Sequence, residues 1–137
     1  MNMGILVGGL NGIERIKNSI IDKAVESANK SQHQQKHGAV VFKGKRIYSI
    51  GYNIPNRSVK SLNPNACRWK TSIHAEVAAI LSAKRDVSGL DILVIRMNSK
   101  NQFMLSKPCS YCRNYLDYCG IRNVYYSITS YPFIGIL

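Results

Sequence analysis

Two cysteines, Cys109 and Cys112, are separated by two residues and preceded by Pro108 in the segment KPCSYC. A Cys-x-x-Cys pair can be a redox couple, half of a metal site, a disulfide that has yet to form, or a coincidence in a helix that contains cysteines. We expect both cysteines at the N-terminus of a helix, where the helix dipole lowers the pKa of a thiol and favours the thiolate. A redox couple and a metal site both need thiolates, so residues elsewhere in the chain must distinguish between them.

A histidine and a glutamate in the segment SIHAEVAAI, His74 and Glu76, favour the metal site. A catalytic zinc ion takes three protein ligands and keeps a fourth position for water. His74, which we also expect at a helix N-terminus, is the best candidate for the third ligand. Glu76 lies two residues further on and can act as a general acid–base on that water without being a ligand. A redox couple would leave the His-x-Glu pair unexplained.

His-x-Glu followed by Pro-Cys-x-x-Cys is the pattern of zinc nucleobase deaminases. At these residues the chain resembles the zinc-dependent cytidine/deoxycytidylate (CMP/dCMP-type) deaminase superfamily, over about residues 13–128. The segments KHGAVVFKGKRIYSIGYN, SIHAEVAAI and SKPCSYCRNYLDYCGIRNVYYS look like blocks of that family in the same order. The resemblance implies Zn²⁺ as cofactor, the cytidine deaminase-like fold and a homo-oligomer.

The resemblance also implies a reaction, the deamination of cytosine to uracil by water. Zn²⁺ held by His74, Cys109 and Cys112 would lower the pKa of a water, and Glu76 would carry its proton to ring N3 and then to the leaving amine. The family further implies contacts with the substrate. The backbone N–H of Ala75 would contact the pyrimidine carbonyl, Asn53 would bind the sugar, and the base pocket would be lined by Gly38, Ala39 and Val40.

Local features point to different branches of this superfamily. A histidine as first ligand favours the deoxycytidylate, nucleic-acid and tRNA-adenosine branches. The segments GYNIPN and CRNYL instead resemble segments of free-cytidine deaminases. Pro55 in GYNIPN departs from that pattern, because it stands in place of their sugar-binding glutamate. We expect a free nucleotide or nucleoside as substrate, deoxycytidylate-like first. The alternatives are a nucleic-acid editing deaminase acting on single-stranded DNA or tRNA, and a non-catalytic, zinc-stabilised nucleic-acid-binding module.

The chain is strongly basic, with 19 Lys+Arg against 7 Asp+Glu and a net charge of +12. No acidic residue occurs between Glu26 and Glu76. Such a field attracts phosphate, so the basic region 43–70 is a possible contact for nucleic acid, with Trp69 available for stacking. The other interpretations are a solvated basic surface and a Trp69 that packs its loop onto the core. Cys67, in the same loop, is expected to be a free thiol.

Hydrophobic periodicity and turn residues predict the elements that position these residues. The order is helix, two strands, helix, strand, helix and strand, which predicts a three-layer α/β/α sandwich with a mixed sheet of four to five strands. We expect His37 at the start of the first strand and a fifth strand at 131–137 that either returns antiparallel or is missing. The predicted segments are a helix at 13–30, a hairpin at 38–53, a loop at 53–71, a helix capped by Thr71 or Ser72 and broken at Gly89, a strand at 90–97, a helix at 106–120 and a strand at 121–129.

The length of 137 residues predicts one domain, at 13–137, after a flexible N-terminal segment at 1–12. No run of about 18 apolar residues is present, so no membrane partner is expected. The four cysteines come without signal-peptide features, which favours reduced thiols and a cytoplasmic location. Cys119 follows Cys112 on the same helical face and is expected to be a core residue.

Overall fold

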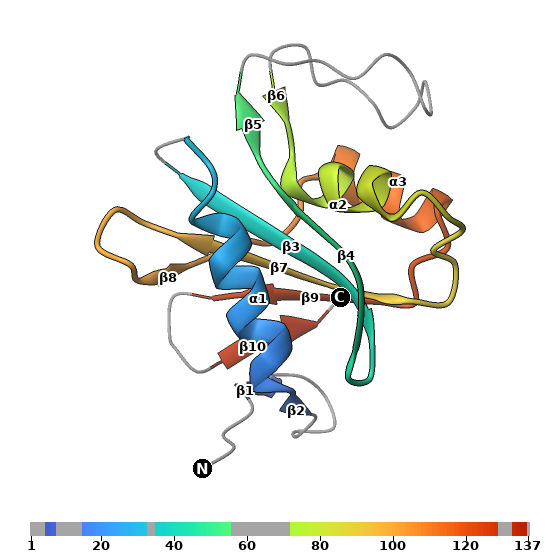
Figure 1. Cartoon of the computed structure of the whole chain (residues 1–137), viewed down its shortest axis with the longest axis horizontal. Coiled ribbons are helices and arrows are strands. Elements are labelled where there is room, and N and C mark those ends of the chain that lie inside the picture. Colours follow the sequence, from blue (N-terminus) through green and yellow to red (C-terminus); the bar gives the residue numbers. More distant parts are fainter. Residues whose placement is uncertain (1–4, 8–14, 33–34, 56–71, 129–132, 137) are drawn as a thin grey trace.

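The computed structural model describes residues 5–7, 15–32, 35–55, 72–128 and 133–136 (Figure 1). Its sheet has the order β2-β1-β10-β9-β7-β3-β4, with β8 paired to β7. The β7/β9 and β1/β10 pairs are parallel and the other pairs are antiparallel, so the sheet is mixed. The five longer strands are β3 (Lys36–Lys43), β4 (Arg46–Tyr52), β7 (Asp91–Met97), β9 (Asn123–Ser127) and β10 (Phe133–Ile136).

Short strands extend this sheet and form a second one. The sheet is extended by β1 (Ile5–Val7), β2 (Arg15–Ile16) and β8 (Phe103–Met104), and a separate two-stranded sheet is formed by β5 (Ile54–Pro55) and β6 (Ser72–Ile73). The sequence did not predict these short pairings, because two or three residues carry no readable alternation.

Helices cover both faces of the sheet, as Figure 1 shows. Helix α1 (Asn18–Ala28) packs on one face, and α2 (Ala75–Ala83) and α3 (Ser110–Tyr118) pack on the other. Alternate residues of β3 separate into the two layers: Ala39 and Val41 pack beneath α2, whereas Val40 and Phe42 pack beneath α1. The predicted three-layer α/β/α sandwich is therefore confirmed.

Two glycines allow the helices to approach the sheet closely. A Cβ at Gly38 would overlap the backbone of Ala24 and Ala28 in α1. A Cβ at Gly51 would overlap the backbone of Ala75 and Ala79 in α2. The second contact holds the first turn of α2 against β4, and that turn carries the His-x-Glu segment.

The first two helices begin and end at other residues than the sequence predicted. Instead of starting at residue 13, α1 begins at Asn18, because residues 15–16 pair with β1. The N-cap of α2 is His74 rather than Ser72, which lies in β6; Thr71 is outside the described residues. Helix α2 ends at Ala83 because Lys84 adopts a left-handed conformation (φ 52°), so Gly89 is not the residue that breaks it.

The predicted β3–β4 hairpin is confirmed, and the question of a fifth strand is answered. Strand β10 pairs antiparallel with β9, with Gly135 opposite Tyr126. Although residues 1–12 were predicted to be flexible, Ile5–Val7 forms β1 beside β10, and the domain division at residue 12 stays a prediction. Among the described residues, no helix is long and apolar enough to cross a membrane.

Candidate active site

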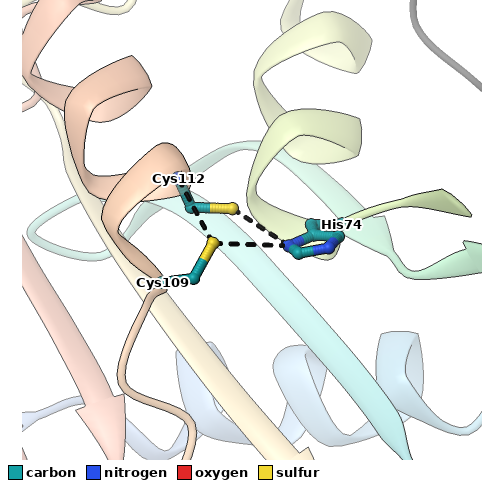
Figure 2. Close-up of side chains that lie close together, drawn as sticks. All are labelled: His74, Cys109 and Cys112. Atoms are coloured by element: carbon teal, nitrogen blue, oxygen red, sulfur yellow. Dashed lines mark hydrogen bonds between the residues drawn. The ribbon is translucent and has the colours of Figure 1, made fainter. Parts of the chain in front are cut away.

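The predicted metal ligands meet at the adjoining N-termini of α2 and α3 (Figure 2). His74 is the N-cap of α2, Cys109 is the N-cap of α3, and Cys112 lies in the first turn of α3. His74 Nδ1 is 3.2 Å from Cys112 Sγ and 3.8 Å from Cys109 Sγ. The three ligand atoms all lie within 4.8 Å of one another.

This donor set fits a zinc ion. In a tetrahedral site with Zn–S of about 2.3 Å and Zn–N of about 2.0 Å, neighbouring ligand atoms are roughly 3.5–3.8 Å apart. The observed separations of 3.2 and 3.8 Å agree with that value to within a few tenths of an ångström. One imidazole and two thiolates from the protein leave a fourth position open, which is the arrangement of catalytic rather than structural zinc.

The charge of the cluster also suits a cation. A hydrogen bond from Cys112 lowers the pKa of Cys109 to about 3, helped by the hydrogen bond with His74 and opposed by partial burial. The same hydrogen bond with Cys109, together with burial, raises the pKa of Cys112. Cys109 is therefore a thiolate at neutral pH. A divalent cation would replace the proton on Cys112, because metal ligands bind in their deprotonated form.

His74 experiences opposing influences. Burial lowers its pKa, but the hydrogen bond with Cys109 and the charges of Glu76 and Cys109 outweigh that effect, and the pKa lies above its ordinary value. The imidazole is thus held next to negative groups, with Nδ1 facing both sulfurs.

Glu76 lies beside the three ligands without belonging to them. It occupies the first turn of α2 and is 5% exposed. Burial raises the pKa of its carboxyl, although a hydrogen bond from its own backbone N–H and the charge of His74 lower it. A buried carboxyl with a raised pKa exchanges a proton nearer to neutral pH than an exposed one, which suits a general acid–base.

A pair of buried serines fixes the segment that leads into Cys109. Ser106 Oγ donates to Val94 O of β7 (2.7 Å) and accepts from Ser127 N of β9 (2.8 Å). Ser127 Oγ donates to Met104 O (2.7 Å) and accepts from Arg96 N (3.1 Å). The chain between β8 and α3 is thereby tied to the ends of two parallel strands, three residues before Cys109.

A cavity of about 250 Å³ opens above the cluster. Among the predicted site residues, it is lined by His74, Ala75, Glu76, Cys109 and Asn53. The other lining residues are not apparent from the sequence, because their placement depends on how β3 and the segment before α3 lie against α2. These are Gln35, His37, Ile54, Ser106 and Lys107.

Asn53 lies at the cavity but also holds the chain together. Its Oδ1 accepts from His37 N (2.9 Å), and its Nδ2 donates to Gln35 O (2.8 Å). The side chain therefore joins the end of β4 to the start of β3. This structural role accompanies the sugar contact that the resemblance implies, which stays a prediction.

Gly38, Ala39 and Val40 do not line the cavity. Gly38 and Val40 face α1, on the opposite side of the sheet from the cluster. Ala39 faces α2 but is fully buried in the core beneath it. Strand alternation decides this: only every second residue of β3 reaches the side of the site, and on that side His37 rather than Ala39 lies at the cavity.

Cys119 packs against the core beneath α2 and α3, as predicted for it. Cys67 and Trp69 lie outside the described residues, as does the basic stretch at 57–70. Of the basic region 43–70, the structure describes the hairpin residues Lys43, Lys45 and Arg46, which are exposed.

Solved structures with the same fold include two pyrimidine deaminases. Cytidine deaminase from Burkholderia pseudomallei superposes with a TM-score of 0.60 at 18% identity, over 88% of this chain and 90% of that chain. The dCMP deaminase of cyanophage S-TIM5 superposes with a TM-score of 0.51 at 21% identity, over 81% and 84% of the two chains. These likenesses establish the cytidine deaminase-like fold.

A sequence relative and a family model extend the comparison. An uncharacterized deaminase in the luxG 3′ region of Aliivibrio fischeri is 34% identical over 91 residues, which are 64% of this chain and 55% of that protein. The aligned part thus spans about half the length of the relative. The model of the cytidine and deoxycytidylate deaminase zinc-binding region matches residues 14–128. With this match and a His/Cys/Cys group of matching chemistry, the chain belongs to the zinc-binding cytidine and deoxycytidylate deaminase family, whose cofactor is Zn²⁺.

Proposed function

We propose that this protein is a zinc-dependent hydrolase that converts cytosine to uracil in a free nucleotide or nucleoside, dCMP- or cytidine-like. The observation that carries the proposal is the convergence of His74, Cys109 and Cys112 within 4.8 Å, beside the buried carboxyl of Glu76, at a cavity. A metal ligand set and a proton carrier beside one cavity are the parts that hydrolytic deamination requires.

In this proposal, His74, Cys109 and Cys112 hold Zn²⁺, which when bound supplies a water of lowered pKa. Glu76 would accept a proton from the attacking water and deliver it to ring N3 as the C4–O bond forms. It would then take the remaining proton of the hydroxyl on C4 and pass it to the amine, which leaves as ammonia when the C4–N bond breaks and the C4 carbonyl forms. The raised pKa of Glu76 supports this role, since the carboxyl must both take up and release a proton.

The helix that carries Glu76 also orients the base. Ala75 is the first residue of α2, where backbone N–H groups have no partner within the helix. Its position at the cavity makes its N–H available to the pyrimidine carbonyl. Asn53 also lines the cavity, where its side-chain amide would contact the sugar.

Two observations favour a small substrate over a nucleic acid. A cavity of about 250 Å³ lies just below the usual range of ligand pockets, about 300–1,000 Å³, and suits one nucleoside or nucleotide. The S-TIM5 enzyme, which shares the fold, was solved in complex with dCMP and dUMP. A homo-oligomer and a nucleic-acid contact through region 43–70 stay predictions.

The test is ammonia release from zinc-loaded protein with cytidine, deoxycytidine, their 5′-monophosphates and a cytosine-containing oligonucleotide. We expect turnover of a free nucleotide or nucleoside. Glu76→Gln should lower kcat by about 10²–10⁴-fold while zinc stays bound. Glu26→Gln, which changes an exposed glutamate of α1 in the same way, is the matched control and should leave activity unchanged.

Other results would replace the proposal. Turnover of the oligonucleotide alone, with steeply salt-dependent binding, would indicate a nucleic-acid editing deaminase. Zinc binding without ammonia release from any cytosine substrate would indicate a zinc-stabilised module without this activity.

A further inference from the structure

Two arginines from different segments lie over one tyrosine ring. The guanidinium carbon of Arg46, the first residue of β4, is 4.8 Å from the centroid of the Tyr48 ring. The guanidinium carbon of Arg85, which follows α2, is 4.7 Å from the same centroid. Both arginines are exposed, whereas Tyr48 is partly buried against the core beneath α2. The face of the ring attracts each guanidinium at such distances, so Tyr48 holds two cations close together.

A β-bulge places Tyr48 between these arginines. The β3–β4 register shifts after Val41, and Tyr48 is the residue of β4 that has no partner on β3. Two consecutive side chains of β4 therefore face α2: Tyr48 packs against that layer, and Ser49 Oγ donates to Ala79 O of the helix. Strand β4 lies at the edge of the sheet, where a bulge changes the direction in which a side chain points.

Lysines add to the positive charge around the Tyr48 ring. Lys43 is the register partner of Arg46, Lys45 lies in the hairpin turn, and Lys84 precedes Arg85. All three lysines are exposed. Together these residues form a surface that we call the basic corner: Lys43, Lys45, Arg46, Tyr48, Lys84 and Arg85.

Little negative charge offsets the basic corner. Asp86 is adjacent in the chain, and its carboxylate accepts from Ser88 N (2.9 Å) and Ser88 Oγ (3.0 Å). The ion pairs found in the described part of the chain are Lys23–Glu26 and Arg122–Asp91, neither of which involves the corner. Five exposed cations therefore act on any polyanion that approaches this surface.

The basic corner is separate from the active site. Helix α2 has nine residues, a length of about 13 Å, and it begins at His74 and Glu76 but ends at the corner. Strand β4 likewise runs from the corner to Asn53 and β5, which lie at the cavity end (Figure 1). A base bound in the cavity does not reach these arginines, so the proposed reaction does not account for them.

We propose that the basic corner is a docking surface for single-stranded nucleic acid, distinct from the cavity in which a free nucleotide or nucleoside reacts. Closely spaced cations bind consecutive phosphates, and an exposed guanidinium also stacks on a base while its N–H groups donate to phosphate. The contact with Tyr48 holds both guanidinium groups in place beforehand. An acidic peptide or a lipid headgroup offers negative charge but no base, so the two arginines at one ring favour a polynucleotide.

Binding to labelled oligonucleotides tests the surface without any catalytic step. The probes are fluorescein-labelled oligo-dT and oligo-U of about 15 nucleotides, which contain no cytosine and distinguish DNA from RNA. Fluorescence anisotropy is followed with the zinc-loaded full chain over a series of salt concentrations. We expect a Kd of about 10⁻⁶–10⁻⁴ M near physiological salt, and a log–log salt slope of about −0.7 for each phosphate contact.

Single substitutions assign that slope to the corner. Arg46→Gln and Arg85→Gln should each flatten the slope by about 0.7, which corresponds to about fivefold weaker binding at about 0.1 M salt. Lys100→Gln removes an exposed charge from the turn between β7 and β8 and is the matched control. It should change neither slope nor affinity.

Conservative substitutions separate stacking from charge alone. Arg85→Lys should keep the salt slope but weaken binding by about two- to fivefold, the contribution of an exposed cation–π contact. Tyr48→Phe retains the ring and should bind like the wild type. Because Arg46 and Arg85 are exposed, their variants should keep the melting temperature to within about 2 °C, so lost binding would not reflect lost folding.

Several results would overturn the docking surface: no oligonucleotide binding, unaltered binding by both Arg→Gln variants, or an equal loss with Lys100→Gln. Equal binding to polyglutamate or to phosphatidylserine vesicles would also overturn it and indicate a peptide or membrane partner instead. If oligonucleotides bind through the corner but no cytosine compound releases ammonia, the proposed reaction fails and the docking surface stands. If free nucleotides are deaminated but no oligonucleotide binds, only the docking surface fails.

Discussion

Replacing Ser127 by alanine tests whether the buried serine pair holds both the fold and the metal site. Ser127 is 1% exposed, and its Oγ contacts two backbone groups, Arg96 N at 3.1 Å and Met104 O at 2.7 Å. Alanine removes both partners without adding any. At about 1 kcal/mol for each backbone group left without its partner, the free energy of unfolding should fall by about 2 kcal/mol.

The effect should extend to zinc. Ser106, whose Oγ lies 2.9 Å from that of Ser127, anchors the segment that ends at Cys109. Loosening this segment allows Cys109 to move relative to His74. Zinc affinity should therefore fall by about tenfold, at the lower end of the losses seen when groups that orient metal ligands are removed.

The assay is urea unfolding of zinc-loaded protein, with zinc affinity measured by competition with a chelator. With m near 2 kcal/mol/M, the midpoint for Ser127→Ala should fall by about 1 M at unchanged m. Ser82→Ala is the control, because Ser82 is exposed on α2 and its hydroxyl bonds only to Ala78 O of its own helix. Ser82→Ala should lower the free energy of unfolding by less than about 0.5 kcal/mol. Equal shifts for the two variants, or lost stability with unchanged zinc affinity, would refute the reasoning.

Three further predictions concern the metal and the close packing. Removing zinc with a chelator should lower the melting temperature by about 10 °C, if the free zinc concentration before removal is about 1,000 times the Kd of the site. A shift below about 2 °C would argue against a tightly bound ion. In the zinc-free protein, Cys109 is a thiolate above its pKa of about 3. The rate of its alkylation by iodoacetamide, followed by mass spectrometry, should therefore stay nearly constant from pH 8 to 5, whereas the rate for glutathione falls about tenfold for each pH unit. Bound zinc should block the alkylation of Cys109. Gly51→Ala adds a Cβ that overlaps the backbone of α2, and it should lower the free energy of unfolding in urea by more than about 3 kcal/mol. Gly44→Ala, at φ +59° but with open space around it, should lower it by about 1 kcal/mol. Equal losses for the two variants would contradict the close contact.

Local chemistry explains why much of the site was readable in the sequence. His74, Glu76, Cys109 and Cys112 lie in short segments whose spacing is dictated by a helix N-terminus and a metal ion, so a few neighbouring residues carry the signal. The three predicted helices and the β3–β4 hairpin follow from periodicity and from the glycine turn at residue 44. The layer order then follows from the sequence of elements.

Other features depend on which elements become neighbours. Lys84 ends α2 in a left-handed conformation that nothing in its residue type predicts, and β1 forms only because β10 offers an unpaired edge. The faces of β3 were assigned to the pocket by resemblance, and the structure turned Gly38 and Val40 towards α1.

The sequence by itself determined the metal, the class of chemistry and the three layers, because each rests on residue types at short spacing. Only the tertiary structure decided what surrounds that chemistry. It brought His37 of β3, Asn53 after β4 and Lys107 before α3 to one cavity, although they are distant in the chain. Register across a sheet is set by pairing between remote segments, and a one-residue shift of β3 would turn His37 to the other face.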